Sequence, residues 1–204
     1  MEDVKVERSV EGLDDFISEA IRFARTSFSL QMLTSHSLVR AYRDFFWKIG
    51  IDPTKTRPSA EALMRRVLQG RDFPRVNVLV DVYNVVSMKK LVPIAAFDAD
   101  KISENLLMRF ARNGEEFFGI GMERPMILKG KEVVVEDGEK LVAVYPYRDA
   151  ETSKVTEMTG KTLFMVCGVP GVAADYLKET STELVEAVRK FCGGHLTFEK
   201  SFTT

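Results

Sequence analysis

Residues 76–100 form an unusually apolar stretch, which constrains the fold more than any other part of the chain. From Val76 to Val86 nearly every residue is apolar, and the exceptions are Asn77, Asp81 and Asn84. Their spacing places them within a sector of about 60° on one face of an α-helix, whereas a strand would direct them to both sides. The sequence therefore predicts an apolar helix with one narrow polar stripe, ending before Pro93 because proline cannot continue a helix.

Two interpretations of this polar stripe stay open. The stripe lines a ligand pocket, in which Asp81 binds an amino group or orients a water molecule, with Ser87 one turn further along. Alternatively, the Asn and Asp side chains tie neighbouring loops to the helix through hydrogen bonds to the backbone. Beyond the helix, Phe97 packs either in the core or against the ring of a ligand. Asp98 braces the loop that follows or contacts the same ligand.

Helical patterns occur at both ends of the chain. Apolar residues recur at helical spacing in residues 13–28, 35–50 and 60–69, and glycines end the second and third of these segments. Near the other end, Thr180 and Glu183 have the spacing of a capping box and predict the start of a last helix, which runs through residue 191.

Strand patterns are grouped between these helices. Alternating or continuous apolar residues predict strands over residues 106–111, 116–120, 132–136, 141–145 and 162–167. The pairs Asn113-Gly114 and Asp137-Gly138 each predict a hairpin turn. Because the strands are grouped and do not alternate with helices, we expect an α+β fold.

Composition limits the class of protein and of site. The chain has 204 residues, of which 45% are hydrophobic and 29% charged, which is typical of a soluble globular domain. No apolar run reaches the roughly 18 residues needed to span a bilayer, and residues 1–11 lack a signal-peptide segment, so we expect a cytoplasmic protein with no membrane partner. The two cysteines form no CxxC pair, and neither histidine has a second ligand at metal spacing. We therefore expect reduced thiols, no metal and no cofactor.

Charge is uneven along the chain, although the formal net charge is only −1. Residues 55–90 contain eight basic and three acidic residues, a local charge of +5. A basic face of this kind could follow a phosphate backbone, and a solvated helix face explains the pattern equally well. The candidates for RNA binding are the five arginines of this stretch, Arg57, Arg65, Arg66, Arg71 and Arg75.

A polar loop follows the predicted strand that ends at Tyr145. Its sequence, Y-P-Y-R-D-A-E-T-S-K-V-T-E-M-T, is rich in side chains that form hydrogen bonds, and such loops often carry functional residues. Arg148 and Lys154 are suited to hold a phosphate or a carboxylate, and Asp149 or Thr156 to place a water molecule. The alternative is a surface turn with an Arg–Asp ion pair of little energetic weight.

The apolar stretch also carries a family resemblance. The pattern N-x-x-V-D-V-x-N-x-V-S, followed by P-I-x-x-F-D-A-D-K-I, resembles the core motif of the B3/B4 tRNA-editing domain in the beta subunit of phenylalanyl-tRNA synthetase. The resemblance extends loosely over residues 57–168, and the flanks resemble free-standing single-domain relatives. The matching residues are Asn77, Val80, Asp81, Val82, Asn84, Val86, Pro93, Phe97 and Asp98.

The resemblance implies a fold and a division of the chain. The expected fold is a three-layer α+β domain with a β-sandwich of unusual topology and helices at both ends of the chain. The expected single domain spans residues 1–204, with a helical part over 1–56, a core over 57–194 and a tail over 195–204.

The activity implied by the resemblance is hydrolysis of mischarged aminoacyl-tRNA in trans, with the aminoacylated 3′ end of tRNA as partner. Because an aminoacyl ester is already activated, a positioned water and an oxyanion-stabilising group suffice. The catalytic candidates are Asp149, Thr156 and Asp81. The substrate-binding candidates are Asn77, Asn84, Ser87, Phe97, Asp98, Arg148 and Lys154.

The chain departs from the family pattern at Ala95. In the bacterial form of the motif a histidine stands two residues before the Phe of F-D, so a mechanism that needs this imidazole is not available here. Two alternatives to catalysis are a binding module of the same fold, for tRNA or an amino-acid-like ligand, and a structural partner of a larger synthetase-like assembly. The sequence specifies neither the amino acid removed nor the oligomeric state.

Overall fold

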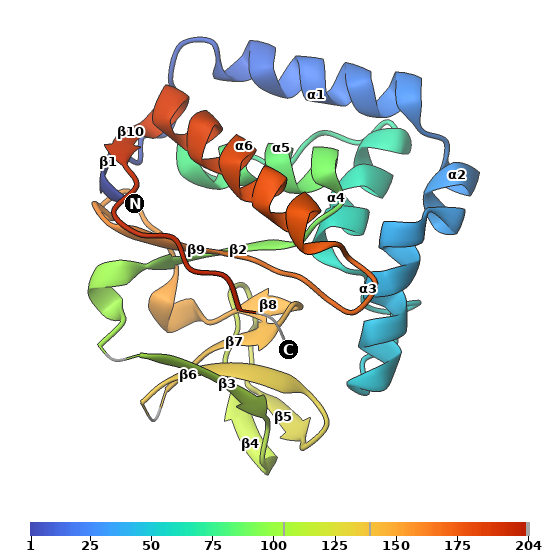
Figure 1. Cartoon of the computed structure of the whole chain (residues 1–204), viewed down its shortest axis with the longest axis vertical. Helices are drawn as coiled ribbons and strands as arrows, with labels where there is room; N and C mark the ends of the chain where they lie inside the picture. Colours follow the sequence, from blue (N-terminus) through green and yellow to red (C-terminus); the bar gives the residue numbers. More distant parts are fainter. Residues whose placement is uncertain (104, 139, 203–204) are drawn as a thin grey trace.

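The helices of the chain form one layer and most of its strands lie below them (Figure 1). The computed structural model describes residues 1–103, 105–138 and 140–202. The class is α+β, as the sequence predicts. The helices are α1 (Leu13–Ser27), α2 (Leu30–Ser35), α3 (Ser37–Lys48), α4 (Ser59–Leu68), α5 (Val78–Lys90) and α6 (Ala174–Cys192), with short 3-10 turns at Ala99–Lys101 and Glu151–Ser153.

The strands in the described part of the chain form four small antiparallel sheets. Three are two-stranded, β1–β10, β2–β9 and β4–β5, and one is four-stranded, in the order β3-β6-β7-β8. The strands are β1 (Glu2–Val4), β2 (Ile94–Asp98), β3 (Leu106–Phe110), β4 (Asn113–Phe117), β5 (Met126–Lys129), β6 (Val133–Asp137), β7 (Lys140–Tyr145), β8 (Arg148–Asp149), β9 (Thr162–Val166) and β10 (Gly193–His195).

The β2–β9 ribbon is the middle layer of the molecule (Figure 1). Successive side chains of a strand point to opposite faces, so this ribbon packs on both sides. Phe164 and Val166 pack against the core of the helical layer, whereas Ala95, Phe97 and Cys167 belong to a second core shared with β6 and β7. The ribbon and the four-stranded sheet thus sandwich this second core. A third core lies between the same sheet and β4–β5.

Helix α5 begins at a capping residue and ends just before a proline. Asn77 is the N-cap, and its side chain accepts a hydrogen bond of 2.9 Å from the Val80 amide. Leu91, in the left-handed conformation with φ of 54°, follows the last turn, and Pro93 then prevents any continuation. The helix is buried on most sides, because it packs against α1, α4 and α6 as well as β2.

The cap gives a first testable prediction. Asn77→Ala should lower the free energy of unfolding by about 1 kcal/mol, because it leaves the Val80 amide without its acceptor. Chemical denaturation measures the difference. The matched control is Asn84→Ala on the same helix, whose side chain makes no hydrogen bond within the described residues. Equal destabilisation by both substitutions would contradict the assignment of Asn77 as the cap.

The last helix begins six residues earlier than the sequence suggests. α6 starts at Ala174, and Thr180 lies inside it, fully buried, with Oγ1 donating to the Tyr176 carbonyl at 2.8 Å. The predicted capping box is therefore wrong: the Thr-x-x-Glu spacing occurs here within a helix, where a threonine hydroxyl can bond the preceding turn.

The two predicted hairpins differ in outcome. β6 and β7 pair on either side of Asp137-Gly138, as predicted. The prediction that Asn113-Gly114 joins two paired strands is wrong, because the strand before it, β3, pairs with β6, and the strand after it, β4, pairs with β5. The sequence also missed the short helix α2.

The chain after α6 begins with the short strand β10. Residues 196–202 add no further strand, and residues 203–204 of the predicted tail lie outside the described residues. The division of the chain into parts 1–56, 57–194 and 195–204 stays a prediction. In the part of the chain that the structure describes, no helix combines the length and the apolar character that crossing a bilayer requires.

Candidate functional site

β8 presents Arg148 and Asp149 to opposite faces of the four-stranded sheet. The strand pairs with β7, with Asp149 opposite Ala143 and Arg148 opposite Val144. The Arg148 side chain runs over Gly119, where a Cβ atom would lie 2.5 Å from the arginine Cδ. Its Nη1 donates to the Ile120 carbonyl at 2.6 Å. Because neighbouring strand residues alternate, Arg148 is turned away from the side that Asp149 faces.

Asp149 is an under-bonded carboxylate in apolar surroundings. Its Oδ2 accepts one hydrogen bond of 3.3 Å from the Ala96 amide of β2, and no other group among the described residues donates to it. Burial raises the pKa of this carboxyl to about 7, and the Ala96 amide opposes that rise only in part. The residue as a whole is partly exposed. Such a group exchanges protons near neutral pH, as a general base must.

Tyr83 is the neighbour of Asp149 that the sequence analysis missed. Burial raises the pKa of its hydroxyl, and the nearby charge of Asp149 adds to the effect. Its ring meets Phe164 of β9 edge-on, with centroids 6.2 Å apart, and no group in the described chain forms a hydrogen bond with its hydroxyl. The available signal was an aromatic residue with a polar tip inside an otherwise aliphatic helix.

Cys167 also lies near Asp149 but is not a nucleophile. Burial raises its pKa well above the ordinary value, and the charge of Asp149 adds to that rise. A thiol of this kind stays protonated and behaves as a small apolar side chain.

The polar stripe of α5 is divided between two roles. Asn77 caps the helix, and Asp81 is fully buried. The Asp81 carboxylate accepts from the Val76 amide at 2.8 Å and from Arg75 Nε at 2.6 Å, which ties the preceding segment to the helix. Of the three residues of the stripe, Asn84 is the one whose side chain has no hydrogen-bond partner among the described residues.

Three further candidates have contacts within the fold. The Ser87 hydroxyl donates to the Val92 carbonyl at 2.7 Å and holds the end of α5. Phe97 is fully buried in the second core. Asp98 Oδ2 accepts from Thr159 Oγ1 at 2.9 Å and lies 3.3 Å from the Lys101 ammonium. These contacts brace the loop after β2.

Thr156 and Lys154 stabilise the loop between β8 and β9. The Thr156 amide donates to Thr159 Oγ1 at 2.9 Å, and its own hydroxyl accepts from the Met158 amide at 3.3 Å. Lys154 pairs with Glu151. The structure therefore does not bring Thr156 or Lys154 into hydrogen-bonding contact with Asp149.

An arginine-lined groove of about 600 Å³ lies between α4, the segment after it, and α5. It contains four of the five arginines predicted to bind RNA. Arg75 is the exception, since it pairs with Asp14 and Asp81. The groove is lined by Arg57, Ser59, Ala62, Leu63, Arg65, Arg66, Gln69, Arg71, Pro74 and Asn84.

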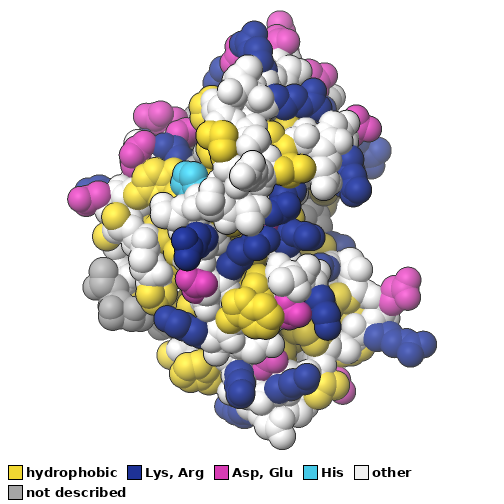
Figure 2. Space-filling model, turned by 90° about the vertical axis from the view of Figure 1, so that its right-hand side faces the viewer, with side chains coloured by type: hydrophobic (Ala, Val, Ile, Leu, Met, Phe, Trp, Pro, Cys, Tyr) yellow, Lys and Arg dark blue, Asp and Glu magenta, His cyan; other side chains and the backbone are white. Residues whose placement is uncertain are grey.

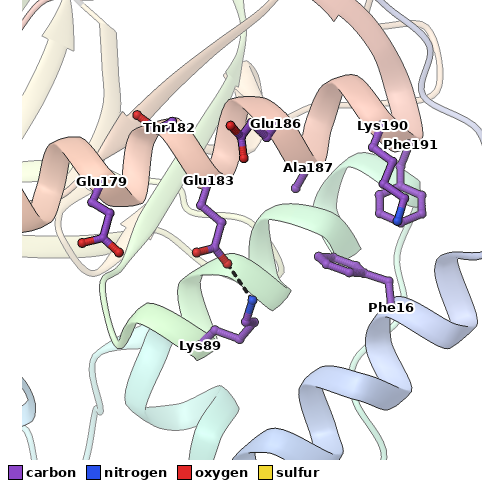
Figure 3. A pocket seen from close by; sticks show the side chains of 9 residues that line it. All are labelled: Phe16, Lys89, Glu179, Thr182, Glu183, Glu186, Ala187, Lys190 and Phe191. Carbon is purple, nitrogen blue, oxygen red and sulfur yellow. Dashed lines mark hydrogen bonds and ion pairs between the residues drawn. The ribbon is translucent and has the colours of Figure 1, made fainter.

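A second hollow, of about 560 Å³, lies where α1, α5 and α6 meet (Figure 3). Phe16 and Phe191 lie at one end of it, with ring centroids 4.9 Å apart. Lys89 points to Glu183 and pairs with it at 2.7 Å (Figure 3). The lining also contains Lys190, Glu179 and Glu186, so three carboxylates face two lysines, and the hollow suits an anionic ligand less than the arginine-lined groove does.

Comparisons with known proteins identify the family. A model of the B3/4 domain matches residues 41–193. The phenylalanine–tRNA ligase beta subunit of Fusobacterium nucleatum subsp. nucleatum is 29% identical over 135 residues, covering 66% of this chain and 16% of that protein. The beta subunit of Geobacter metallireducens is 35% identical over 108 residues, covering 52% and 13%. The chain thus spans less than a fifth of the length of these relatives.

Solved structures also resemble the chain. Among them is an N-terminal fragment of the phenylalanyl-tRNA synthetase beta subunit from Pyrococcus horikoshii, with a TM-score of 0.48 and 19% identity, covering 55% of this chain and 40% of that one. The family model, in contrast, covers well over half of the chain. The chain belongs to the B3/4 domain family.

Proposed function

We propose that this protein hydrolyses the ester bond of mischarged aminoacyl-tRNA in trans, with Asp149 as the general base. The observation that carries the proposal is the Asp149 carboxylate itself, which belongs to a partly exposed residue, is bonded only to the Ala96 amide among the described residues, and has a pKa raised to about 7 by burial. Family membership supports tRNA as the partner, because the relatives are phenylalanine–tRNA ligase beta subunits. In the chain itself, a groove with four arginines supports a polyanionic partner.

The chemistry needs one proton acceptor and one water molecule. Ionised Asp149 takes a proton from water as the water oxygen bonds to the ester carbonyl carbon. The carbonyl–ribose bond then breaks, and the proton passes to the departing ribose oxygen. The products are a free amino acid and tRNA with an intact terminal hydroxyl. An aminoacyl ester is activated enough for a positioned base to contribute about 10²–10⁴-fold.

The surroundings of Asp149 suit an amino-acid side chain. β2 carries two small side chains, Ala95 and Ala96, where its backbone meets the carboxylate. The Tyr83–Phe164 pair provides an aromatic surface. The Tyr83 hydroxyl, which has no hydrogen-bond partner among the described residues, is suited to pair with a polar group of the substrate. Such a contact discriminates strongly because the wrong substrate leaves it unpaired. Because position 95 is alanine and not the histidine of the bacterial motif, Asp149 is the group that we assign as the base.

A deacylation assay tests the proposal. Several tRNAs, each charged with a cognate or a non-cognate amino acid, are incubated with the protein, and ester loss is compared with the uncatalysed rate. We expect faster loss for at least one mischarged tRNA, with a rate that rises with pH through about 7 as Asp149 ionises. If no charged tRNA loses its amino acid faster than in buffer, catalysis is excluded.

The second candidate function is binding without catalysis, to tRNA or an amino-acid-like ligand. It is favoured by one observation: the groove with four arginines and no acidic residue in its lining needs no contribution from Asp149. Tight binding of tRNA combined with no acceleration of ester loss would establish this alternative.

A further inference from the structure

We infer that the arginine-lined groove between α4 and α5 binds consecutive phosphates of an RNA backbone, at a surface separate from the Asp149 site. The identity of the RNA rests on the proposed function, whereas the groove's affinity for phosphodiesters does not. Four of its ten lining residues are arginines and none is acidic. Its volume of about 600 Å³ lies within the range of about 300–1,000 Å³ typical of ligand sites.

A buried carboxylate beneath the groove holds its arginines in place. Glu61 is 2% exposed and lies on the first turn of α4. It accepts hydrogen bonds from Arg43 Nη2 and from Arg65 Nε, both at 2.6 Å, and lies 3.9 Å from Arg57 Nε. Burial alone would raise the pKa of Glu61, but the bonds from Arg43 and Arg65 outweigh burial and hold it below its usual range. The carboxylate therefore stays charged at neutral pH.

Arg65 is fixed at two points and still has donors to offer. Its Nε is bound by Glu61, and its Nη2 donates to Thr34 Oγ1 at 2.8 Å. No acceptor in the described chain takes its Nη1. A guanidinium already held in one orientation loses little entropy when it binds a phosphate, so pre-organisation of this kind favours affinity.

Two exposed arginines supply further donors. Arg66 uses Nε to bind the Asp72 carbonyl, which leaves its two terminal nitrogens without acceptors among the described residues. In the same set of residues, the guanidinium of Arg71 and the amide of Asn84 have no partner. Guanidinium groups bind phosphate oxygens in pairs, and several along one groove match a repeating anion better than a single small one.

The charge pattern of the surface agrees with this assignment. Lys and Arg side chains gather in a band across the middle of the face that carries α2, α3 and α4 (Figure 2). In contrast, the lining of the other hollow contains three glutamates and two lysines, and one of these lysines, Lys89, pairs with Glu183 (Figure 3). The positive charge that remains available to a ligand therefore lies on the α4 side.

The test measures binding of uncharged tRNA, and of inorganic phosphate alone, to the full-length protein over a series of salt concentrations. Arg66→Ala and Arg71→Ala remove exposed side chains, so the fold should be retained. Each should weaken tRNA binding about tenfold and reduce the slope of log affinity against log salt by about 1, with losses that add in the double variant. Arg71→Lys should keep most of the salt slope. The matched control is Arg124→Ala, an exposed arginine between β4 and β5, which should change neither quantity.

Four outcomes overturn the inference: no tRNA binding by the wild-type protein, unchanged binding by the double variant, an equal loss with Arg124→Ala, or inorganic phosphate displacing tRNA at similar concentrations. The last outcome would indicate a site for a small free anion. Asp149→Asn separates the two proposals, because it should retain tRNA binding while losing hydrolysis. Wild-type binding with the expected salt slope but without ester loss would uphold the groove and refute the proposed catalysis.

Discussion

Asp149→Asn should lower the rate of aminoacyl-ester hydrolysis by about 10²–10⁴-fold. The substitution keeps the shape of the side chain but cannot accept a proton from water, so the hydrolytic step loses its base. The measurement is single-turnover deacylation of the best mischarged tRNA. The matched control is Asp44→Asn, an exposed carboxylate on α3, which should leave the rate unchanged. An unaltered rate with Asp149→Asn would show that another group activates the water.

The same substitution should stabilise the protein at alkaline pH. The pKa of Asp149 is about 7 in the folded protein, against about 3.9 for an exposed aspartate. A raised folded-state pKa means that the unfolded chain ionises first, so stability falls as pH rises from about 4 to about 7 and stays reduced above that. Three pKa units correspond to about 4 kcal/mol, and partial exposure reduces this to about 2–3 kcal/mol.

Chemical denaturation of both proteins at pH 4 and pH 8 measures this effect. Asp149→Asn should exceed the wild type by about 2–3 kcal/mol at pH 8 and by much less at pH 4. If Asp149→Asn is less stable than the wild type at both pH values, the Asp149 carboxylate stabilises the fold, and its burial does not lower the free energy of unfolding. Gain of stability together with loss of rate is the pattern expected of a functional residue.

Phe97→Ala should lower the free energy of unfolding by about 3–5 kcal/mol. The ring is fully buried in the second core, together with Ala95, Tyr145 and Cys167, and its removal leaves a cavity between the β2–β9 ribbon and the large sheet. For a chain of this length such a loss lowers Tm by roughly 10 °C. Thermal and chemical denaturation both measure it.

The control for Phe97 is a smaller apolar change. Phe97→Leu should cost clearly less than Phe97→Ala, because leucine fills part of the space that the ring leaves. Neither variant, once folded, should change KM for the mischarged tRNA. A raised KM with unchanged stability would instead place the ring against the substrate, the other interpretation that the sequence allows.

The elements that sequence predicts best are those whose signals are local. α5 is recognisable because its cap, its apolar faces and Pro93 are all within one stretch, and the β6–β7 hairpin because Asp137-Gly138 lies between two apolar runs. The start of α6 is not recognisable from the sequence, because Thr180 and Glu183 have the spacing of a capping box but lie inside the helix. β3 pairs with β6, further along the chain, and not with β4, and Asn113-Gly114 does not encode this pairing.

The same distinction holds for the candidate site. The polar loop around Asp149 is visible in the sequence, but a two-residue strand is too short to reveal that Arg148 and Asp149 point apart. The motif residues Asn77 and Asp81 left open both a pocket and backbone contacts, and their partners Val80 and Val76 show that they make backbone contacts that hold the fold. Tyr83 becomes a candidate only once β8 and β9 are placed beside it.

Tyr83 and Asn84 are consecutive residues of α5, one near the carboxylate of Asp149 and the other in the lining of the arginine groove. Consecutive helical residues differ by about 100° around the axis and about 1.5 Å along it. The relative position of the two surfaces is therefore fixed by a rigid helix and not by a hinge. Lengthening a neighbouring loop would leave it unchanged, whereas one residue inserted between Tyr83 and Asn84 would rotate one surface by about 100° relative to the other.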